Sequence, residues 1–144
     1  MAGNAAPIYS KDGEVANNGT TGMNQLVTAA ANDYTGISAN NSLIFTADAT
    51  NGSFVQRIRF KAGGSNVATV ARIYINNGST NTTATNNQFY GEVSLPATTA
   101  TATAATVEID YPIGFALPAG FKLYFGLGTA VASGWVATVV GGNY

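Results

Sequence analysis

The chain has 144 residues, and Asp, Glu, Lys and Arg make up only 9% of it, where a soluble domain usually carries about 25%. With six cations and seven anions, it has no basic stripe for binding a nucleic acid. His and Cys are absent, which excludes Ser-His-Asp and Cys-His catalysis, zinc or haem ligation by these residues, and disulfides. We therefore expect a protein that is not an enzyme and holds no cofactor or metal.

Small neutral residues replace the missing charge, since Ala, Thr, Gly and Asn account for 74 of the 144 positions. Hydrophobic residues still make up 46% of the chain and the mean hydropathy is +0.12, which is too apolar for an unfolded chain. No run of about 18 apolar residues predicts a membrane span. The first residues lack the pattern of a secretory signal, so we expect synthesis in a host cytoplasm without a signal peptide.

The chain begins with a polar stretch and continues in short segments with a period of two. Residues 1–22 are expected to form an extended N-terminal arm or an edge segment, and residues 23–144 a single β-sandwich domain. Each strand-like segment is bounded by Asn-Gly, Gly-Gly, Pro or Ser-Gly turn signals. The expected strands cover residues 24–30, 42–47, 53–61, 67–76, 88–95, 106–110, 122–127 and 134–140.

The clearest alternation lies in residues 53–61. It predicts Phe54, Ile58 and Phe60 on one face, and Arg57, Arg59 and Lys61 on the other together with Val55. The Gly63-Gly64 pair tolerates positive φ, so we expect a hairpin between this strand and residues 67–76.

Fold class follows from these segments. Eighteen Thr and 17 Gly disfavour helices, and no capping signal precedes an amphipathic helical pattern. We expect an all-β, jelly-roll-like β-sandwich of roughly eight short antiparallel strands. The low-complexity run 97–105 has two interpretations, a flexible loop or a flat strand packed against another chain.

Two sets of charged residues are candidate sites. Arg57, Arg59 and Lys61 form either an ordinary exposed face or a docking stripe for an acidic protein partner. Glu108 and Asp110 project from one face of a strand, and such a pair serves as acid and base in glycoside hydrolysis, although a solvated or interface role is the simpler interpretation.

Other motifs carry less chemistry. Asp48–Ser53 faintly resembles a calcium loop but lacks the EF-hand frame, so a side-chain-capped turn is favoured. The pairs Gly63-Gly64 and Gly126-Leu-Gly128 lack the features of a phosphate loop. Five aromatic residues at strand spacing are expected in the core, the alternative being a sugar-stacking platform: Phe89, Tyr90, Tyr124, Phe125 and Trp135.

The surface expected from this composition favours assembly. Lys and Glu are depleted from the cores of protein interfaces, partly because their desolvation is costly. A near-neutral surface of small side chains can approach another chain with little electrostatic or entropic penalty. We therefore expect a domain that binds copies of itself and a larger lattice.

Several phrases resemble small virion proteins of tailed bacteriophages that decorate or cement the capsid. They are AGNAAPIYSK at 2–11, GSFVQRIRFK at 52–61, NVATVARIYINNG at 66–78, LPAGFKL at 117–123 and GWVATVVGGNY at 134–144. The resemblance implies a jelly-roll-like fold, frequent trimers on the outer capsid surface, and reinforcement of capsomer junctions. Its partners would be further copies of the chain and the major capsid protein, with no nucleic acid and no membrane.

The N-terminal arm is the expected capsid or partner contact, because an extended segment can add backbone pairing at a neighbouring sheet edge. Its candidate contact residues are Asn4, Pro7, Ile8, Tyr9 and Lys11, beside Arg57, Arg59 and Lys61. Two rival functions stay open. One is a carbohydrate- or receptor-binding module of a phage tail fibre or spike, and the other is a glycan-cleaving enzyme that uses Glu108 and Asp110.

Overall fold

The computed structural model describes residues 12–16 and 26–144, and apart from one 3-10 turn the regular secondary structure in this part of the chain is β-strand. The elements are β1 (Asp12–Ala16), β2 (Ser42–Thr46), β3 (Ser53–Ala62), β4 (Thr69–Asn76), the 3-10 helix η1 (Ala84–Asn86), β5 (Asn87–Leu95), β6 (Glu108–Leu117), β7 (Lys122–Leu127) and β8 (Trp135–Asn143).

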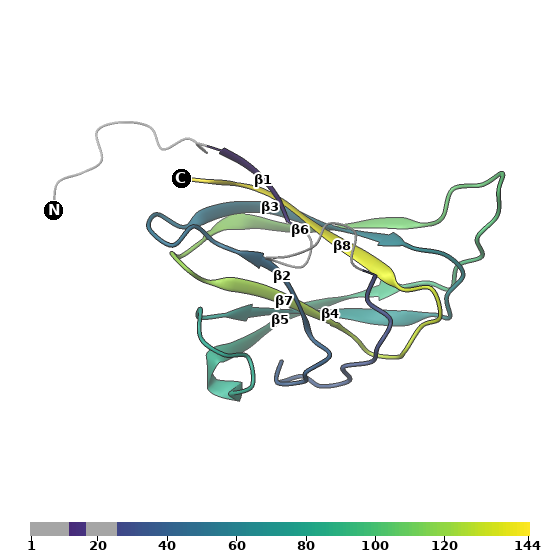
Figure 1. Cartoon of the computed structure of the whole chain (residues 1–144), viewed down its shortest axis with the longest axis horizontal. Coiled ribbons are helices and arrows are strands. Elements are labelled where there is room, and N and C mark those ends of the chain that lie inside the picture. Colours follow the sequence, from purple (N-terminus) through teal and green to yellow (C-terminus); the bar gives the residue numbers. More distant parts are fainter. Residues whose placement is uncertain (1–11, 17–25) are drawn as a thin grey trace, which may run out of the picture.

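The strands form two four-stranded sheets that lie in two layers (Figure 1). Sheet A has the order β1-β8-β3-β6, and sheet B has the order β2-β7-β4-β5. Every pairing is antiparallel, and β4 pairs with β5, β3 with β6, β2 with β7 and β1 with β8. These nested pairs describe one long hairpin rolled into two sheets. That is the jelly roll, so the expected fold class is confirmed.

The hydrophobic core lies between the sheets. Trp135, Phe60 and Val55 come from sheet A, and Phe45 and Phe125 from sheet B, and none is more than 1% exposed. Phe60 and Phe125 meet edge to face, with ring centroids 5.5 Å apart, and so join the two layers. Alternate residues of β3, β4 and β8 are buried, as expected for sheets with one face on the core.

The expected hairpin between β3 and β4 is wrong, because the two strands belong to different sheets. Neither Gly63 nor Gly64 uses positive φ. A side chain at Gly63 would lie 2.8 Å from the Ser133 carbonyl oxygen, so the glycine permits a close approach instead of a tight turn. Asn66 then exchanges two backbone hydrogen bonds with Thr98, at 3.1 and 2.8 Å, which fixes the crossing between the layers.

The predicted faces of β3 are wrong at one end of the strand. Val55 is fully buried and Phe54 only partly so, which reverses their expected positions. Over the span from Val55 to Arg57, β6 has one residue more than β3, whereas β3 has one residue more than β8, which is a β-bulge in β3. The extra residue, Gln56, changes which side chains face the core. Beyond the bulge, Ile58 and Phe60 point inward as expected.

Other boundaries also differ from expectation. Residues 26–30 make isolated bridges, from Val27 to Trp135 and from Ala30 to Leu127, instead of a strand. Residues 12–16, within the expected arm, form β1 at the edge of sheet A. β6 continues to Leu117, through Pro112, which an edge strand tolerates.

The run 97–105 joins β5 to β6 as a loop that projects beyond the end of the two sheets (Figure 1). It contains no strand, and most of its residues are exposed. It is tied down at its start, where Ala100 donates its backbone N–H to the Ser65 hydroxyl at 2.9 Å.

Candidate functional site

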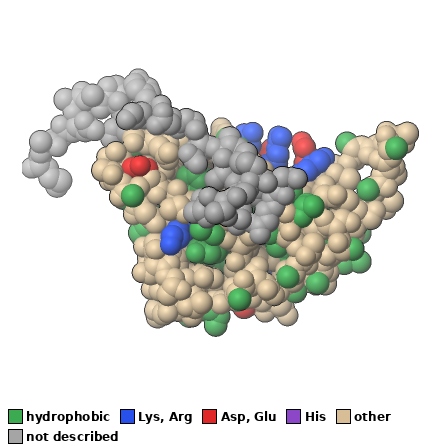
Figure 2. Space-filling view, viewed as in Figure 1, with side chains coloured by type: hydrophobic (Ala, Val, Ile, Leu, Met, Phe, Trp, Pro, Cys, Tyr) green, Lys and Arg blue, Asp and Glu red, His purple; other side chains and the backbone are tan. Residues whose placement is uncertain are grey.

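The predicted cations of β3 lie on the outer face of sheet A, but they are not alone there. In the pairing of β3 with β6, Arg59 stands opposite Asp110 and Lys61 opposite Glu108. The cation stripe and the carboxylate pair of the sequence therefore form one surface feature. We call Arg57, Arg59, Lys61, Glu108 and Asp110 the charge ladder. Basic and acidic side chains gather together on this side of the molecule in Figure 2.

The ladder is a continuous run of ion pairs. Asp110 Oδ1 lies 3.5 Å from Arg57 Nε and 3.3 Å from Arg59 Nε. Glu108 lies 3.8 Å from Arg59 Nη2 and 3.9 Å from Lys61 Nζ. Lys61 also donates to the Thr106 carbonyl at 2.6 Å. Three cations and two anions leave a net charge of only +1.

This arrangement weakens the glycosidase interpretation of Glu108 and Asp110. Both carboxylates face cations along one open sheet surface, whereas glycoside hydrolysis needs two carboxyl groups on either side of a bound sugar. Both side chains are about half exposed, at 53% and 49%. The pair is therefore suited to surface recognition.

A row of partly buried residues on β8 lies beside the ladder. In the pairing of β3 with β8, Lys61 stands opposite Val136, Arg59 opposite Thr138 and Arg57 opposite Val140. The outer face of sheet A thus combines a strip of small apolar and hydroxyl side chains with a strip of alternating charge.

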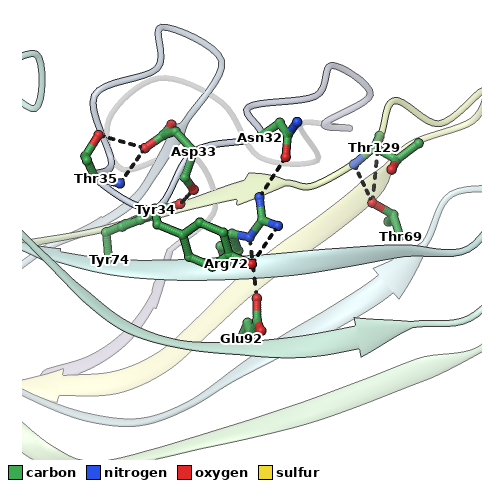
Figure 3. Close-up of polar contacts among 9 residues, drawn as sticks. All are labelled: Asn32, Asp33, Tyr34, Thr35, Thr69, Arg72, Tyr74, Glu92 and Thr129. Carbon is green, nitrogen blue, oxygen red and sulfur yellow. Dashed lines mark hydrogen bonds and ion pairs between the residues drawn. The ribbon is translucent and has the colours of Figure 1, made fainter.

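A second cluster, which the sequence did not indicate, lies on the outer face of sheet B (Figure 3). We call Asn32, Tyr34, Arg72, Phe89 and Glu92 the Tyr34 cluster. Arg72 of β4 extends away from the core, and its side chain is 11% exposed. The segment 26–41 reaches this face because Ala31 donates its backbone N–H to Leu127, at the end of β7, at 2.7 Å.

Arg72 is the centre of the cluster. Its Nε lies 3.4 Å from Glu92 Oε2, its Nη1 donates to Asn32 Oδ1 at 3.3 Å, and its Nη2 donates to the Tyr34 hydroxyl at 3.1 Å. The guanidinium also lies over the Tyr34 ring, with Cζ 4.1 Å from the centroid, in a cation–π contact. Phe89 of β5 meets the Tyr34 ring edge to face at 5.2 Å.

Asp33 holds the loop that carries Tyr34. Its Oδ1 accepts the backbone N–H groups of Thr35, at 2.8 Å, and of Gly36, and its Oδ2 accepts that of Ser38 at 3.2 Å. Partial burial acts to raise the pKa of Asp33, but these hydrogen bonds outweigh it and bring the pKa below its ordinary value of 3.8. The carboxylate is therefore ionised at neutral pH.

Tyr74 fixes this loop to the sheet. It is fully buried although it lies on the outer side of β4, and its hydroxyl donates to the Asp33 carbonyl oxygen. Burial, followed by the negative charge of Asp33, raises the pKa of Tyr74 to about 12. The hydroxyl consequently remains a hydrogen-bond donor throughout the neutral range.

The aromatic residues singled out in the sequence do not form a platform. Trp135 and Phe125 are 0% and 1% exposed in the core, and Tyr90 and Tyr124 are partly buried. The expected core role is thus confirmed for Trp135 and Phe125. Phe89 is the exception at 37% exposure, and it contacts Tyr34, which is 56% exposed.

An open hollow lies next to the Tyr34 cluster, lined by Asn32, Ala68, Thr69, Val70, Arg72, Gly128 and Thr129. One wall is fixed, since the Thr69 hydroxyl donates to the Thr129 carbonyl at 3.1 Å and accepts the Thr129 N–H at 2.9 Å. The hollow shares Asn32 and Arg72 with the cluster, so a bound group could contact both.

The remaining candidates from the sequence stand as follows. In Asp48–Ser53 the Asp48 carboxylate accepts the N–H groups of Thr50 and Asn51, at 3.0 and 2.7 Å, which confirms the side-chain-capped turn. No group of three or more potential metal-ligating side chains occurs within residues 12–16 and 26–144. The expected arm contacts Asn4, Pro7, Ile8, Tyr9 and Lys11 lie outside the described residues.

Comparison with known proteins finds no relative of this chain. The chain matches no known protein family, no curated protein and no solved structure. Among the residues that the structure describes, there is no helix with the length and apolar character needed to cross a membrane.

Proposed function

We propose that this chain is a structural virion protein that docks on the outside of a tailed-phage capsid as a homo-oligomer and stabilises capsomer junctions. The observation that carries the proposal is the charge ladder, which gathers three of the chain's six cations and two of its seven anions on one sheet face. The resemblance to phage decoration proteins leads us to expect three copies per oligomer.

The ladder is better explained by recognition than by stability. Ion pairs this exposed contribute about 1 kcal/mol or less each, because water and salt screen them. Their arrangement along one face nevertheless defines a pattern of charge that a complementary surface can match. In a chain with so few charges, such a pattern distinguishes one face of the sandwich from the other.

The ladder fits a different kind of partner from the acidic surface expected from the sequence. A bare cationic stripe would need an acidic surface, whereas the ladder alternates in sign and has a net charge of only +1. A partner with its own alternating charges fits better, and the adjacent Val136, Thr138 and Val140 supply small side chains that pack closely. The fold is compatible with this role, because jelly rolls occur in viral capsid domains as well as in lectins, but the fold alone does not decide between them.

Exchanging the charges of the ladder tests this proposal. Arg57→Glu, Arg59→Glu, Lys61→Glu, Glu108→Lys and Asp110→Lys, made together, keep ion pairs between β3 and β6 while inverting the pattern presented to a partner. We expect the exchanged protein to fold with an unchanged melting temperature and to lose at least about tenfold in affinity for phage heads stripped of this protein.

The matched control is Lys122→Glu, which reverses one cation on β7 of the other sheet and should leave head binding unchanged. Cosedimentation with the heads measures binding, and analytical ultracentrifugation measures self-association. A wild-type protein that stays monomeric and does not bind heads would overturn the proposal, as would an exchanged ladder that binds as well as the wild type.

A further inference from the structure

We propose that the Tyr34 cluster is a binding site for a neutral saccharide. This inference goes beyond docking on a capsid, because the cluster lies on the outer face of sheet B and the charge ladder on the outer face of sheet A. A protein bound through its ladder would present the Tyr34 cluster to the surroundings.

The cluster is assembled from parts of the chain that are distant in sequence. Tyr34 and Asn32 come from the loop, Arg72 from β4, and Phe89 and Glu92 from β5, and Arg72 and Tyr34 are 38 residues apart. The loop is held in place by Asp33 and by Tyr74 beneath it. The polar groups and rings are thus held in position before any ligand binds, which lowers the entropic cost of binding.

Two exposed rings supply the apolar part of the site. Tyr34 is 56% exposed and Phe89 is 37% exposed, and they are in contact with each other. The C–H groups on one side of a pyranose ring form an apolar patch that packs against an aromatic ring. Exposed apolar side chains that adjoin one another, unlike single ones, are the kind of surface that marks a binding site.

The polar part of the site retains unused hydrogen-bonding capacity. Glu92 Oε2 faces Arg72, and within the described part of the chain Glu92 Oε1 has no hydrogen-bond partner. Asn32 Oδ1 accepts from Arg72, which leaves the Asn32 amide nitrogen available as a donor. One acceptor and one donor, on opposite sides of the Arg72 guanidinium (Figure 3), match two hydroxyl groups of a sugar, one donating and one accepting.

Charge selects a neutral ligand. The Arg72 guanidinium is already paired with the Glu92 carboxylate, and Asp33 adds a second negative charge nearby. A sialic acid or sulfate group would therefore meet two carboxylates and one cation that is already neutralised. An uncharged hexose or N-acetylhexosamine is not repelled by these carboxylates, and its hydroxyl groups can use both the donor and the acceptor.

An array of neutral, sialylated and sulfated oligosaccharides tests the site, using the full chain at pH 7. We expect retention of neutral glycans, followed by millimolar to micromolar affinity when the best of them is titrated in solution. Tyr34→Ala should reduce this affinity at least about tenfold, and Glu92→Gln, which keeps the shape of the side chain but weakens the acceptor, by a similar factor.

Val107→Ala is the control, since it trims another exposed apolar side chain just before β6 of the opposite sheet. It should bind glycans as the wild type does, and circular dichroism should show all three variants folded. Absence of retained glycans, retention of anionic glycans alone, or unchanged affinity in Tyr34→Ala would each overturn the proposal. Loss of head binding in Tyr34→Ala would instead place the cluster in the capsid interface and overturn it as well.

Discussion

At the scale of single residues, Asp33 links the fold to the candidate saccharide site. Its carboxylate accepts the backbone N–H groups of Thr35, Gly36 and Ser38. The same loop carries Tyr34 and accepts a hydrogen bond from the buried Tyr74 hydroxyl. Hydrogen bonds to an ionised acceptor are stronger than those between neutral groups. Asp33 therefore holds the loop in the position that Arg72 and Phe89 require.

Asp33→Asn should lower the free energy of unfolding by about 1–3 kcal/mol, because the amide nitrogen replaces an acceptor where Ser38 donates. The pKa of Asp33 is lower in the folded protein than its ordinary value of 3.8, so its ionised form stabilises the fold above that pH. This contribution is lost as the pH falls through the lower folded pKa.

Urea unfolding at pH 7 and at pH 2–3 measures both effects. The difference between wild type and Asp33→Asn should be larger at pH 7 and should shrink in acid. Asp110→Asn, which removes an exposed carboxylate paired only with side-chain cations, is the control and should cost less than about 1 kcal/mol. Equal losses for the two variants at pH 7 would contradict the role given to Asp33.

At the scale of elements, the bulge in β3 decides which side chains reach the core. It brings the Phe54 carbonyl oxygen so close to β8 that a side chain at Gly141 would lie 2.2 Å from it. Because the oxygen belongs to the backbone and a Cβ is fixed directly to it, the clash cannot be relieved without shifting a strand. The bulge and Gly141 consequently depend on each other.

The bulge predicts that two adjacent substitutions differ in how much they destabilise the fold. Val55→Asp places an unpaired charge in the core and should cost more than about 3 kcal/mol or prevent folding. Phe54→Asp, at a partly exposed position, should cost about 1–2 kcal/mol. Thermal and urea unfolding compare them, and the reverse order would mean that β3 alternates without a bulge.

Gly141→Ala should destabilise the protein by about 1–3 kcal/mol, because the added methyl group collides with β3 backbone. Gly128→Ala is the matched control, since a methyl group there would lie 3.6 Å from its nearest neighbour, Arg72, at an ordinary contact distance. Similar melting temperatures for the two variants would show that the strands can separate without penalty.

The sequence predicted local structure well and long-range pairing poorly. The strand at 122–127 coincides with β7, since its alternation and its flanking turns are local features. The bulge at Gln56 left no sign in the sequence, because one extra residue inside a periodic segment changes no residue type. The Gly63-Gly64 pair indicated a break between two strands, but the predicted hairpin was wrong, because the role of Gly63 is a close approach to the distant Ser133.

The same limit applies to the candidate sites. The cations of β3 and the carboxylates of β6 were each visible as a pattern, but Arg59 and Asp110 are 51 residues apart, and only the sheet order brings them together. Tyr34 belonged to none of the sequence motifs that indicated a candidate site. Its partners Arg72 and Phe89 lie on two other elements, so the cluster exists only after the jelly roll has formed.

At the scale of the whole molecule, the two sheets present different surfaces. Sheet A displays alternating charge beside small side chains, and sheet B displays two exposed rings around an Arg–Glu pair. A domain that attaches through one face and exposes the other needs this kind of asymmetry. Docking through the charge ladder, as proposed, would give the protein one orientation on the capsid, with the ladder toward the lattice.

Electron cryomicroscopy of phage heads that carry this protein measures that orientation most directly. We expect copies of the jelly roll at the junctions between capsomers, with Arg59 and Glu108 within contact distance of the major capsid protein and Tyr34 facing solvent. Heads that lack this density, or density in which the outer face of sheet A is turned toward solvent and makes no contact, would contradict it.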